Sequence, residues 1–150
     1  MKLSTKGRYG LRALIDLALY SENETVSIQS IAKRQNISDS YLEQLMRKLR
    51  SAGLIVSVRG AQGGYKLARP ANEISVGDVL RALEGSLEAV TCGGEDNSCQ
   101  GADLCVTKFV WERINSSIRD TVDSIKLSQL VEESRLMREK GQIQVQKCDN

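Results

Sequence analysis

Histidine is absent from this chain of 150 residues, and proline, phenylalanine and tryptophan occur once each. Without histidine, no imidazole can serve as a metal ligand. Aromatic residues make up only 4% of the chain and hydrophobic residues 41%, so the sequence predicts a core that is mostly aliphatic. The length suits one domain, or a small domain with an appended oligomerisation element.

Long apolar runs are also missing. No stretch reaches 18 apolar residues, so we expect neither a membrane span nor a membrane partner. Near the N-terminus, Arg8, Arg12 and Asp16 interrupt any apolar core that a signal peptide would need. The protein is therefore expected in the cytoplasm, where structural disulfides are uncommon.

Charge is unevenly distributed along the chain. Residues 1–70 hold 12 Lys and Arg against 5 Asp and Glu, whereas residues 71–150 hold 9 against 14. A basic first part beside an acidic second part favours an N-terminal segment that meets phosphates, although solvated charge alone can produce the same division.

The central segment has the pattern of a helix-turn-helix. Ser27–Gln35 carries apolar residues three and four apart, which predicts an amphipathic helix, and Asn36–Ser38 interrupts it. A second amphipathic helix follows, with Ser38 or Ser40 as its cap and Gly53 as its stop signal. In a helix-turn-helix, the second helix can enter the major groove of DNA.

A β-hairpin is expected directly afterwards. Leu54–Val58 is rich in β-branched residues, Arg59–Gly64 is a glycine-rich turn, and Tyr65–Leu67 returns. A hairpin with a basic tip beside a helix-turn-helix is typical of a DNA-binding wing. The alternative is an ordinary helical core with a surface hairpin.

Three cysteines form the second informative stretch. Cys92, Cys99 and Cys105 lie within fourteen residues that are otherwise rich in glycine and polar side chains. Thiolates favour zinc or iron–sulfur clusters, but the spacing lacks the close cysteine pairs of common zinc modules. A disulfide and three inert thiols are the alternatives.

A long amphipathic helix is predicted over Asp103–Ser124. Its apolar stripe comprises Val110, Trp111, Ile114, Ile118, Val122 and Ile125. Such a face needs a partner, and a two-helix dimer interface would let two winged units read two half-sites of an operator. Packing within one chain is the alternative.

The predicted fold is mainly α with a small β-hairpin wing, namely a winged helix-turn-helix followed by a long dimerisation helix. A helix from Ser4 or Thr5 to about Tyr20 precedes it, and a short helix capped by Ser75 ends at Gly85. The expected divisions are residues 1–85 for DNA binding, 86–105 for the cysteine loop, 103–131 for the dimerisation helix and a short following helix, and 132–150 for a charged mobile tail.

Together these motifs resemble the iron–sulfur cluster regulators of the IscR family, which are dimeric winged-helix transcription factors of bacteria. The resemblance runs from Met1 to about Val131 and is carried by Ser4–Tyr9, Ser40–Leu45, Val58–Tyr65 and the three cysteines. It implies a DNA-binding regulator, expected to act as a repressor of iron–sulfur biogenesis genes. Such a protein would sense cluster status and receive its cluster from the iron–sulfur assembly machinery.

The resemblance also implies the cofactor. The family binds a 2Fe–2S cluster through three cysteines and a histidine, and cluster occupancy alters which operators it binds. The cysteines correspond to Cys92, Cys99 and Cys105, but the histidine position is occupied by Lys108. The remaining candidates for the fourth ligand are Glu95, Asp96, Asp103, Cys148 and a group from the partner chain. We expect a ligand other than cysteine.

Eight residues are expected to contact a double-stranded operator. Early on the recognition helix, the candidates for base contacts are Ser40, Tyr41, Glu43 and Gln44. The candidates for phosphate contacts are Arg47, Lys48 and Arg50, and Arg59 is expected to reach a minor groove from the wing.

Two other functions remain possible on the sequence. A repressor of cysteine metabolism shares the winged part but lacks the cysteine loop, and it responds to a partner enzyme. A redox protein would use the cluster catalytically, but the sequence shows neither a phosphate-binding loop nor a base–nucleophile pair. No enzymatic activity is therefore expected.

Overall fold

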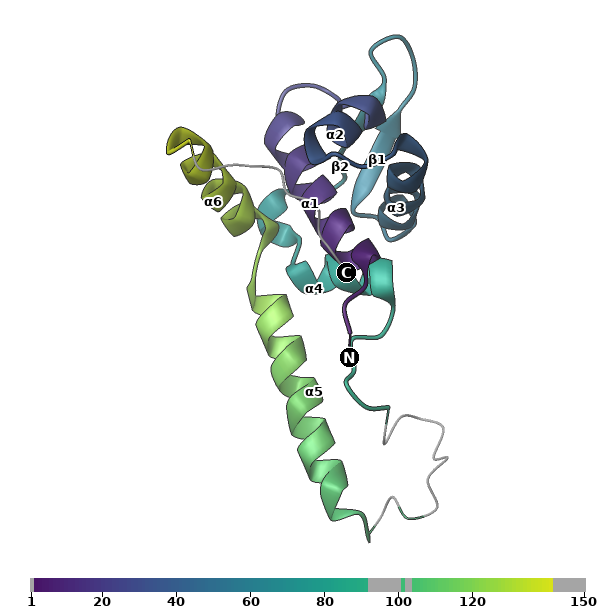
Figure 1. Cartoon of the computed structure of the whole chain (residues 1–150), viewed down its shortest axis with the longest axis vertical. Helices are drawn as coiled ribbons and strands as arrows, with labels where there is room; N and C mark the ends of the chain where they lie inside the picture. Colours follow the sequence, from purple (N-terminus) through teal and green to yellow (C-terminus); the bar gives the residue numbers. More distant parts are fainter. Residues whose placement is uncertain (1, 92–100, 102–103, 142–150) are drawn as a thin grey trace.

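A computed structural model describes residues 2–91, 101 and 104–141 of the chain. A helical body carries a two-stranded hairpin, and one long helix extends away from it (Figure 1). In chain order the elements are α1 (Thr5–Tyr20), α2 (Ile28–Gln35), α3 (Asp39–Ser51), β1 (Ile55–Val58), β2 (Gly64–Leu67), the 3₁₀ turn η1 (Ala71–Glu73), α4 (Val76–Glu84), α5 (Val106–Ser124) and α6 (Leu127–Glu139). The prediction of a mainly α fold with a hairpin wing is confirmed.

Serine side chains begin the first four α-helices. Ser4, Ser27, Ser38 and Ser75 each accept a hydrogen bond from a backbone N–H in the first turn of α1, α2, α3 and α4. A cap of this kind is worth about 1 kcal/mol of stability. The recognition helix thus begins after Ser38, which decides between the two caps that the sequence allowed.

The core is aliphatic, as its composition predicts. Its largest fully buried side chains come from α1, α2, α3, β1 and its approach, the segment after η1, α4 and α6, and they are Leu14, Leu17, Ile31, Leu42, Leu45, Met46, Leu49, Leu54, Ile55, Ile74, Leu83 and Leu127. The apolar stripe expected on α3 is therefore its inward face.

The last helix corrects the expected division of the chain. Residues 132–139 were predicted as the start of a mobile tail, but α6 continues to Glu139, and residues 142–150 lie outside the described part. Leu127 and Val131, one helical turn apart, are buried in the same core as α1. Because α6 completes this core, the winged unit does not end at residue 85.

The long helix also begins later than expected. It was predicted from Asp103, yet α5 starts at Val106, because Cys105 has extended backbone angles (φ −85°, ψ 104°) and occupies the N-cap position. Within the described residues, no helix is both long and apolar enough to cross a membrane.

Candidate DNA-binding surface and cysteine segment

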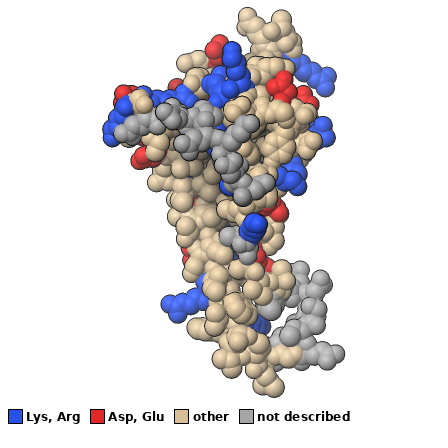
Figure 2. All heavy atoms as spheres, in the orientation of Figure 1, with Lys and Arg blue, Asp and Glu red and all other residues tan. Residues whose placement is uncertain are grey.

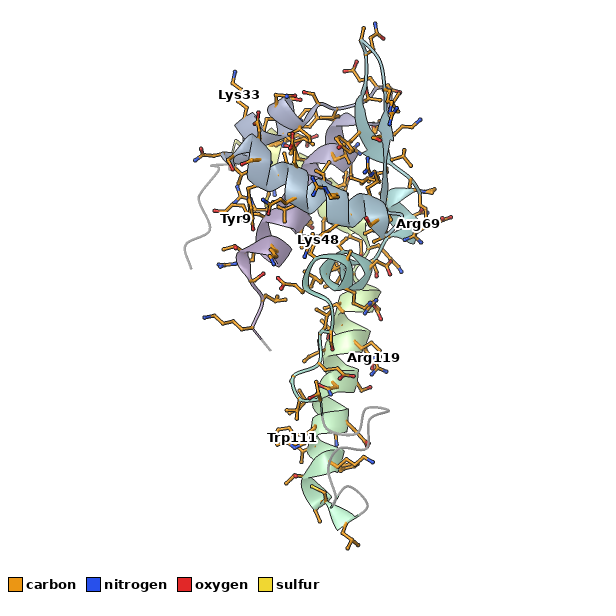
Figure 3. The ribbon with its side chains drawn as sticks, turned by 90° about the vertical axis from the view of Figure 1, so that its right-hand side faces the viewer. Tyr9, Lys33, Lys48, Arg69, Trp111 and Arg119 are labelled. Carbon is orange, nitrogen blue, oxygen red and sulfur yellow. The ribbon has the colours of Figure 1, made fainter. Side chains whose placement is uncertain are left out.

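The turn between α2 and α3 has the geometry of a helix-turn-helix. Asn36 ends α2 in the left-handed conformation (φ 54°), which its short polar side chain tolerates. Ile37 then packs on the core and Ser38 starts α3. Leu42, Leu45, Met46 and Leu49 face inward, so the polar side of α3 lies on the surface of the body (Figure 3).

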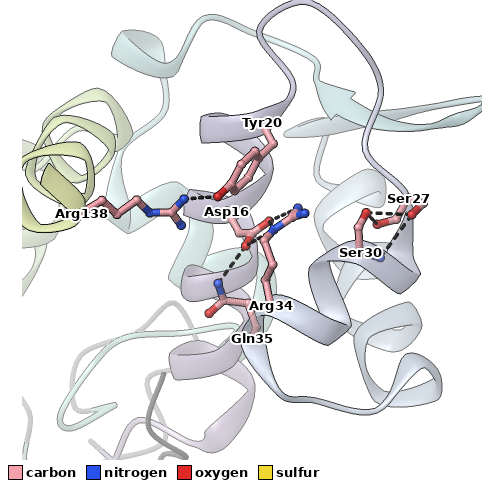
Figure 4. Close-up of polar contacts among 7 residues, drawn as sticks. All are labelled: Asp16, Tyr20, Ser27, Ser30, Arg34, Gln35 and Arg138. Carbon is pink, nitrogen blue, oxygen red and sulfur yellow. Dashed lines mark hydrogen bonds and ion pairs between the residues drawn. The ribbon is translucent and has the colours of Figure 1, made fainter. Parts of the chain in front are cut away.

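An ion pair with a buried carboxylate holds α2 against α1. Arg34 donates to both carboxylate oxygens of Asp16, at 2.6 to 3.1 Å, and Gln35 donates to Asp16 Oδ2 at 2.9 Å (Figure 4). Asp16 is only 1% exposed. The hydrogen bonds with Asp16 raise the pKa of the Arg34 guanidinium, which stays charged.

Tyr20 connects this pair to the end of the described chain. Its ring stacks on the Arg34 guanidinium, with 4.0 Å between the charged carbon and the ring centroid, and its hydroxyl accepts a hydrogen bond from Arg138 of α6. Sequence reasoning missed this cluster. The available signal was a carboxylate, Asp16, set between apolar residues of α1.

The eight residues predicted to contact DNA differ in their contacts within the chain. Ser40, Glu43, Gln44, Arg47 and Arg59 are exposed. Tyr41 instead packs edge-on against Tyr9, with 6.1 Å between ring centroids, and donates to Thr5 at 3.3 Å. To reach DNA, Tyr41 would have to exchange these contacts.

Lys48 and Arg50 also have partners within the chain. Lys48 Nζ donates to the carbonyl of Leu83 in the last turn of α4, at 3.3 Å, where a cation suits the helix dipole. Arg50 lies 3.5 Å from the hydroxyl of Ser57 on β1. Both side chains are exposed, so phosphate contact remains a prediction for each.

The wing is an antiparallel hairpin whose register runs from Ile55 opposite Leu67 to Val58 opposite Gly64. Arg59 follows β1 directly and is exposed. Of the three glycines in the wing turn, Gly60 has a positive φ, at 114°, whereas Gly63 and Gly64 do not. Gly63 and Gly64 are required for another reason: a side chain at either would meet backbone atoms, and at Gly64 it would lie 2.6 Å from the Val26 carbonyl oxygen.

Of the expected cluster ligands, only Cys105 and Lys108 lie within the described residues; Cys92, Glu95, Asp96, Cys99, Asp103 and Cys148 do not. Cys105 is exposed, with Sγ 3.0 Å from the Thr107 hydroxyl. Hydrogen bonds from Thr107 and from the Lys108 backbone lower the pKa of this thiol, which favours the thiolate that iron binds. In the described part of the chain, no group of three potential ligands is assembled.

The side chain of Lys108, which has the position of the family's histidine ligand, forms an ion pair within α5. Its ammonium lies 3.9 Å from the carboxylate of Glu112, one turn further along α5. Its nitrogen would have to leave this ion pair before it could bind a metal.

The two ends of α5 have different surroundings. Near the body, Ile118, Val122 and Ile125 pack against Val76, Leu80 and Leu87. Toward its N-terminus, large apolar side chains are exposed: Val106, Phe109, Val110 and Ile114, after Leu104. In Figure 2 the arm formed by α5 shows few charged side chains, whereas Lys and Arg are frequent on the body.

Comparison with known proteins shows extended similarity. The family model Rrf2, described as iron-dependent transcriptional regulator, matches residues 3–133. The HTH-type transcriptional regulator IscR of Pectobacterium atrosepticum is 44% identical over 137 residues, which cover 91% of this chain and 83% of that protein. IscR of Vibrio campbellii is 43% identical over the same length, covering 91% and 81%.

Solved structures give the same fold. IscR of T. potens superposes with a TM-score of 0.72 at 45% identity, covering 96% of this chain and 93% of that one. CymR, described as the global cysteine regulator of B. subtilis, superposes with a TM-score of 0.73 at 39% identity, covering 89% and 98%. The two scores are nearly equal, so the fold does not distinguish these two kinds of regulator.

Proposed function

The chain belongs to the Rrf2 family and is a DNA-binding transcriptional regulator of the IscR type, and we propose that it binds operators as a homodimer and senses iron–sulfur cluster status through a 2Fe–2S cluster. Its family and its relatives are transcriptional regulators, so the chain is not an enzyme. The proposal places it in the cytoplasm, in contact with DNA and with the machinery that supplies clusters.

The observation that carries the DNA-binding part is the exposed polar side of α3, held in place by a buried opposite face and flanked by the wing (Figure 3). We assign base contacts to Ser40, Glu43 and Gln44 near the start of α3, because N-terminal residues of a recognition helix meet base edges. Arg47, Lys48 and Arg50 would neutralise phosphates further along, and Arg59 would enter a minor groove.

Replacing Gln44 by alanine tests the base-reading role. A glutamine can make two hydrogen bonds to adenine, so Gln44→Ala should weaken binding to the selected duplex by about 1–3 kcal/mol and relax one base position. The duplex is first recovered from a random-sequence pool by binding to the wild-type chain, and affinity is measured by fluorescence anisotropy.

Arg47→Ala is the matched comparison on the same helix. A phosphate contact carries no sequence information, so this variant should lose affinity for selected and random duplexes alike, with a shallower salt dependence. If Gln44→Ala also loses equally on both duplexes, Gln44 does not read a base.

The proposal of a 2Fe–2S cluster rests on the chemistry of the three cysteine thiols. Three thiolates suit iron, and Cys105 has the exposure and the lowered pKa that a ligand needs. We propose that Cys92, Cys99 and Cys105 hold the 2Fe–2S cluster and that the fourth ligand is not a cysteine. Bound there, the cluster would supply a removable group whose presence reports cluster supply. The cysteine loop is also what favours this reading over a cysteine-metabolism repressor.

The exposed half of α5 supports the proposed homodimer. Val106, Val110 and Ile114 lie four residues apart on one face and are 85%, 45% and 38% exposed, while the other half of the helix is used for packing within the chain. A second copy of α5 would bury these side chains and place two recognition helices for two half-sites.

Replacing Ile114 by aspartate should convert the dimer to a monomer at micromolar concentration. It places an unpaired carboxylate in an apolar interface, which costs at least about 2 kcal/mol for each chain. Analytical ultracentrifugation measures the change. Arg119→Asp is the control, because position 119 lies about 140° round the helix from position 114. A dimer that persists in Ile114→Asp would place the interface elsewhere.

A further inference from the structure

The wing is attached to the body at two points along β2 and its turn. Val26, in the connection between α1 and α2, exchanges backbone hydrogen bonds with Tyr65 of β2, at 2.9 and 2.8 Å. This connection therefore pairs with β2 through an isolated antiparallel β-bridge. Gly64 permits the approach, since a side chain there would collide with the Val26 backbone.

The second attachment is a single side chain. Thr25 Oγ1 donates a hydrogen bond of 2.6 Å to the carbonyl oxygen of Gln62, which lies in the turn between β1 and β2. The N–H of Gly63 donates to the carbonyl oxygen of Gly60. This hydrogen bond lies within the turn and does not connect the turn to the body.

Apart from the hydrogen bond of Thr25, little apolar packing holds the wing turn against the body. A hollow of about 690 Å³ lies between the α1–α2 connection and the wing turn, and Tyr20, Thr25, Arg34 and Gln62 are among the residues that line it. The turn residues Arg59, Gly60, Ala61 and Gln62 are all exposed. Few apolar contacts are thus available to keep the tip at a set angle to α3.

We infer that Thr25 is a positioning residue for DNA binding: its hydroxyl holds the wing turn so that Arg59 reaches the minor groove while α3 occupies the major groove. Arg59 is three residues from Gln62 in the same turn, so a change in the tip's angle displaces its guanidinium. The inference rests on the proposed DNA-binding role of the wing, and it assigns to Thr25 no contact with DNA.

Thr25→Val is the test, because valine keeps the shape and removes the hydroxyl. The expected loss corresponds to the free energy of one hydrogen bond, so affinity for the selected duplex should fall about 3- to 10-fold. Thr25→Ser keeps the hydroxyl and should restore wild-type affinity. The melting temperature of Thr25→Val should fall by no more than a few degrees, as the loss of one hydrogen bond implies, and that of Thr25→Ser should match the wild type, so the loss of affinity is not due to unfolding.

A double-mutant cycle shows whether Thr25 acts through the wing. Once Arg59→Ala has removed the group that Thr25 positions, Thr25→Val should cause no further loss of affinity. An equal loss in both backgrounds, an unchanged affinity, or a failure of serine to restore it would overturn the inference.

A measurement without DNA separates this inference from the proposed function. Backbone ¹⁵N relaxation of Gly60 and Gly63 should show greater mobility in Thr25→Val and wild-type behaviour in Thr25→Ser. If mobility rises as expected but no duplex is selected from the pool, the proposed function fails and the attachment of the wing stands. If mobility is unchanged, the positioning role is wrong whatever the DNA result.

Discussion

Replacing Asp16 by alanine is expected to lower the free energy of unfolding by about 1.5–3 kcal/mol, the range for hydrogen bonds to a charged group. The carboxylate is buried and receives three hydrogen bonds from Arg34 and one from Gln35. Its loss leaves the guanidinium of Arg34 without its counter-charge in a partly buried site. Because a domain of this size has only about 5–15 kcal/mol of stability, this single change removes a large fraction.

Urea denaturation at one fixed protein concentration measures the effect, since a dimer's stability depends on concentration. Asp123→Ala is the control: Asp123 also pairs with an arginine, Arg81, but 39% of its side chain is exposed. An exposed pair is worth about 0–1 kcal/mol. Equal losses in the two variants would show that burial of Asp16 does not set its contribution.

A second variant distinguishes charge from packing. Combining Asp16→Leu with Arg34→Met removes both charges and fills the space with apolar side chains, which recovers most of the stability in comparable buried pairs. If the double variant is as unstable as Asp16→Ala, the polar network itself, including the bond from Gln35, is what α1 and α2 require.

The second large effect concerns the cluster. Replacing any one of Cys92, Cys99 and Cys105 by serine should abolish the visible absorption of the anaerobically purified protein and reduce its iron and sulfide to background. A serine hydroxyl binds iron poorly beside thiolates, because soft sulfur ligands match iron–sulfur clusters. Cys105 is exposed, so Cys105→Ser should leave the helical circular dichroism signal and the melting temperature of the cluster-free chain unchanged.

Cys148→Ala is the control for this series. The proposal assigns the fourth position to a ligand other than cysteine, so this variant should keep its spectrum and its iron. Loss of the cluster in Cys148→Ala would instead identify Cys148 as the fourth ligand. Retention of the cluster in Cys105→Ser would exclude Cys105 as a ligand, whereas absence of iron and sulfide from the anaerobically purified wild-type protein would favour the cysteine-metabolism alternative.

Local patterns in the sequence determined the type and order of the elements. Serine before an apolar-periodic segment predicted the starts of α1 and α4 because a cap and its helix lie within four residues. The apolar residues of α3 identified its inward face, because their spacing of three and four residues is also a local property of the sequence. The cysteine triplet was also recognised from local sequence, since a thiol's preference for iron depends on its chemistry, and its role as a cluster site stays a prediction.

Tertiary structure decided what depends on distant parts of the chain. Asp16 and Arg34 are 18 residues apart, and their pairing follows from how α1 and α2 cross. Tyr41 and Lys48 lie on the polar side of α3 by spacing, yet the positions of α1 and α4 draw both into internal contacts.

The role of α6 was decided in the same way. Residues up to 131 were predicted to include a short helix, but the part from residue 132 looked like a charged tail. Leu127 and Val131 bury this helix in the core that contains α1, more than a hundred residues away. Thr25 gives no local signal either, since its partner Gln62 is 37 residues distant. Sequence periodicity reports which side of a helix is apolar, whereas the partner of each polar group is set by packing between elements.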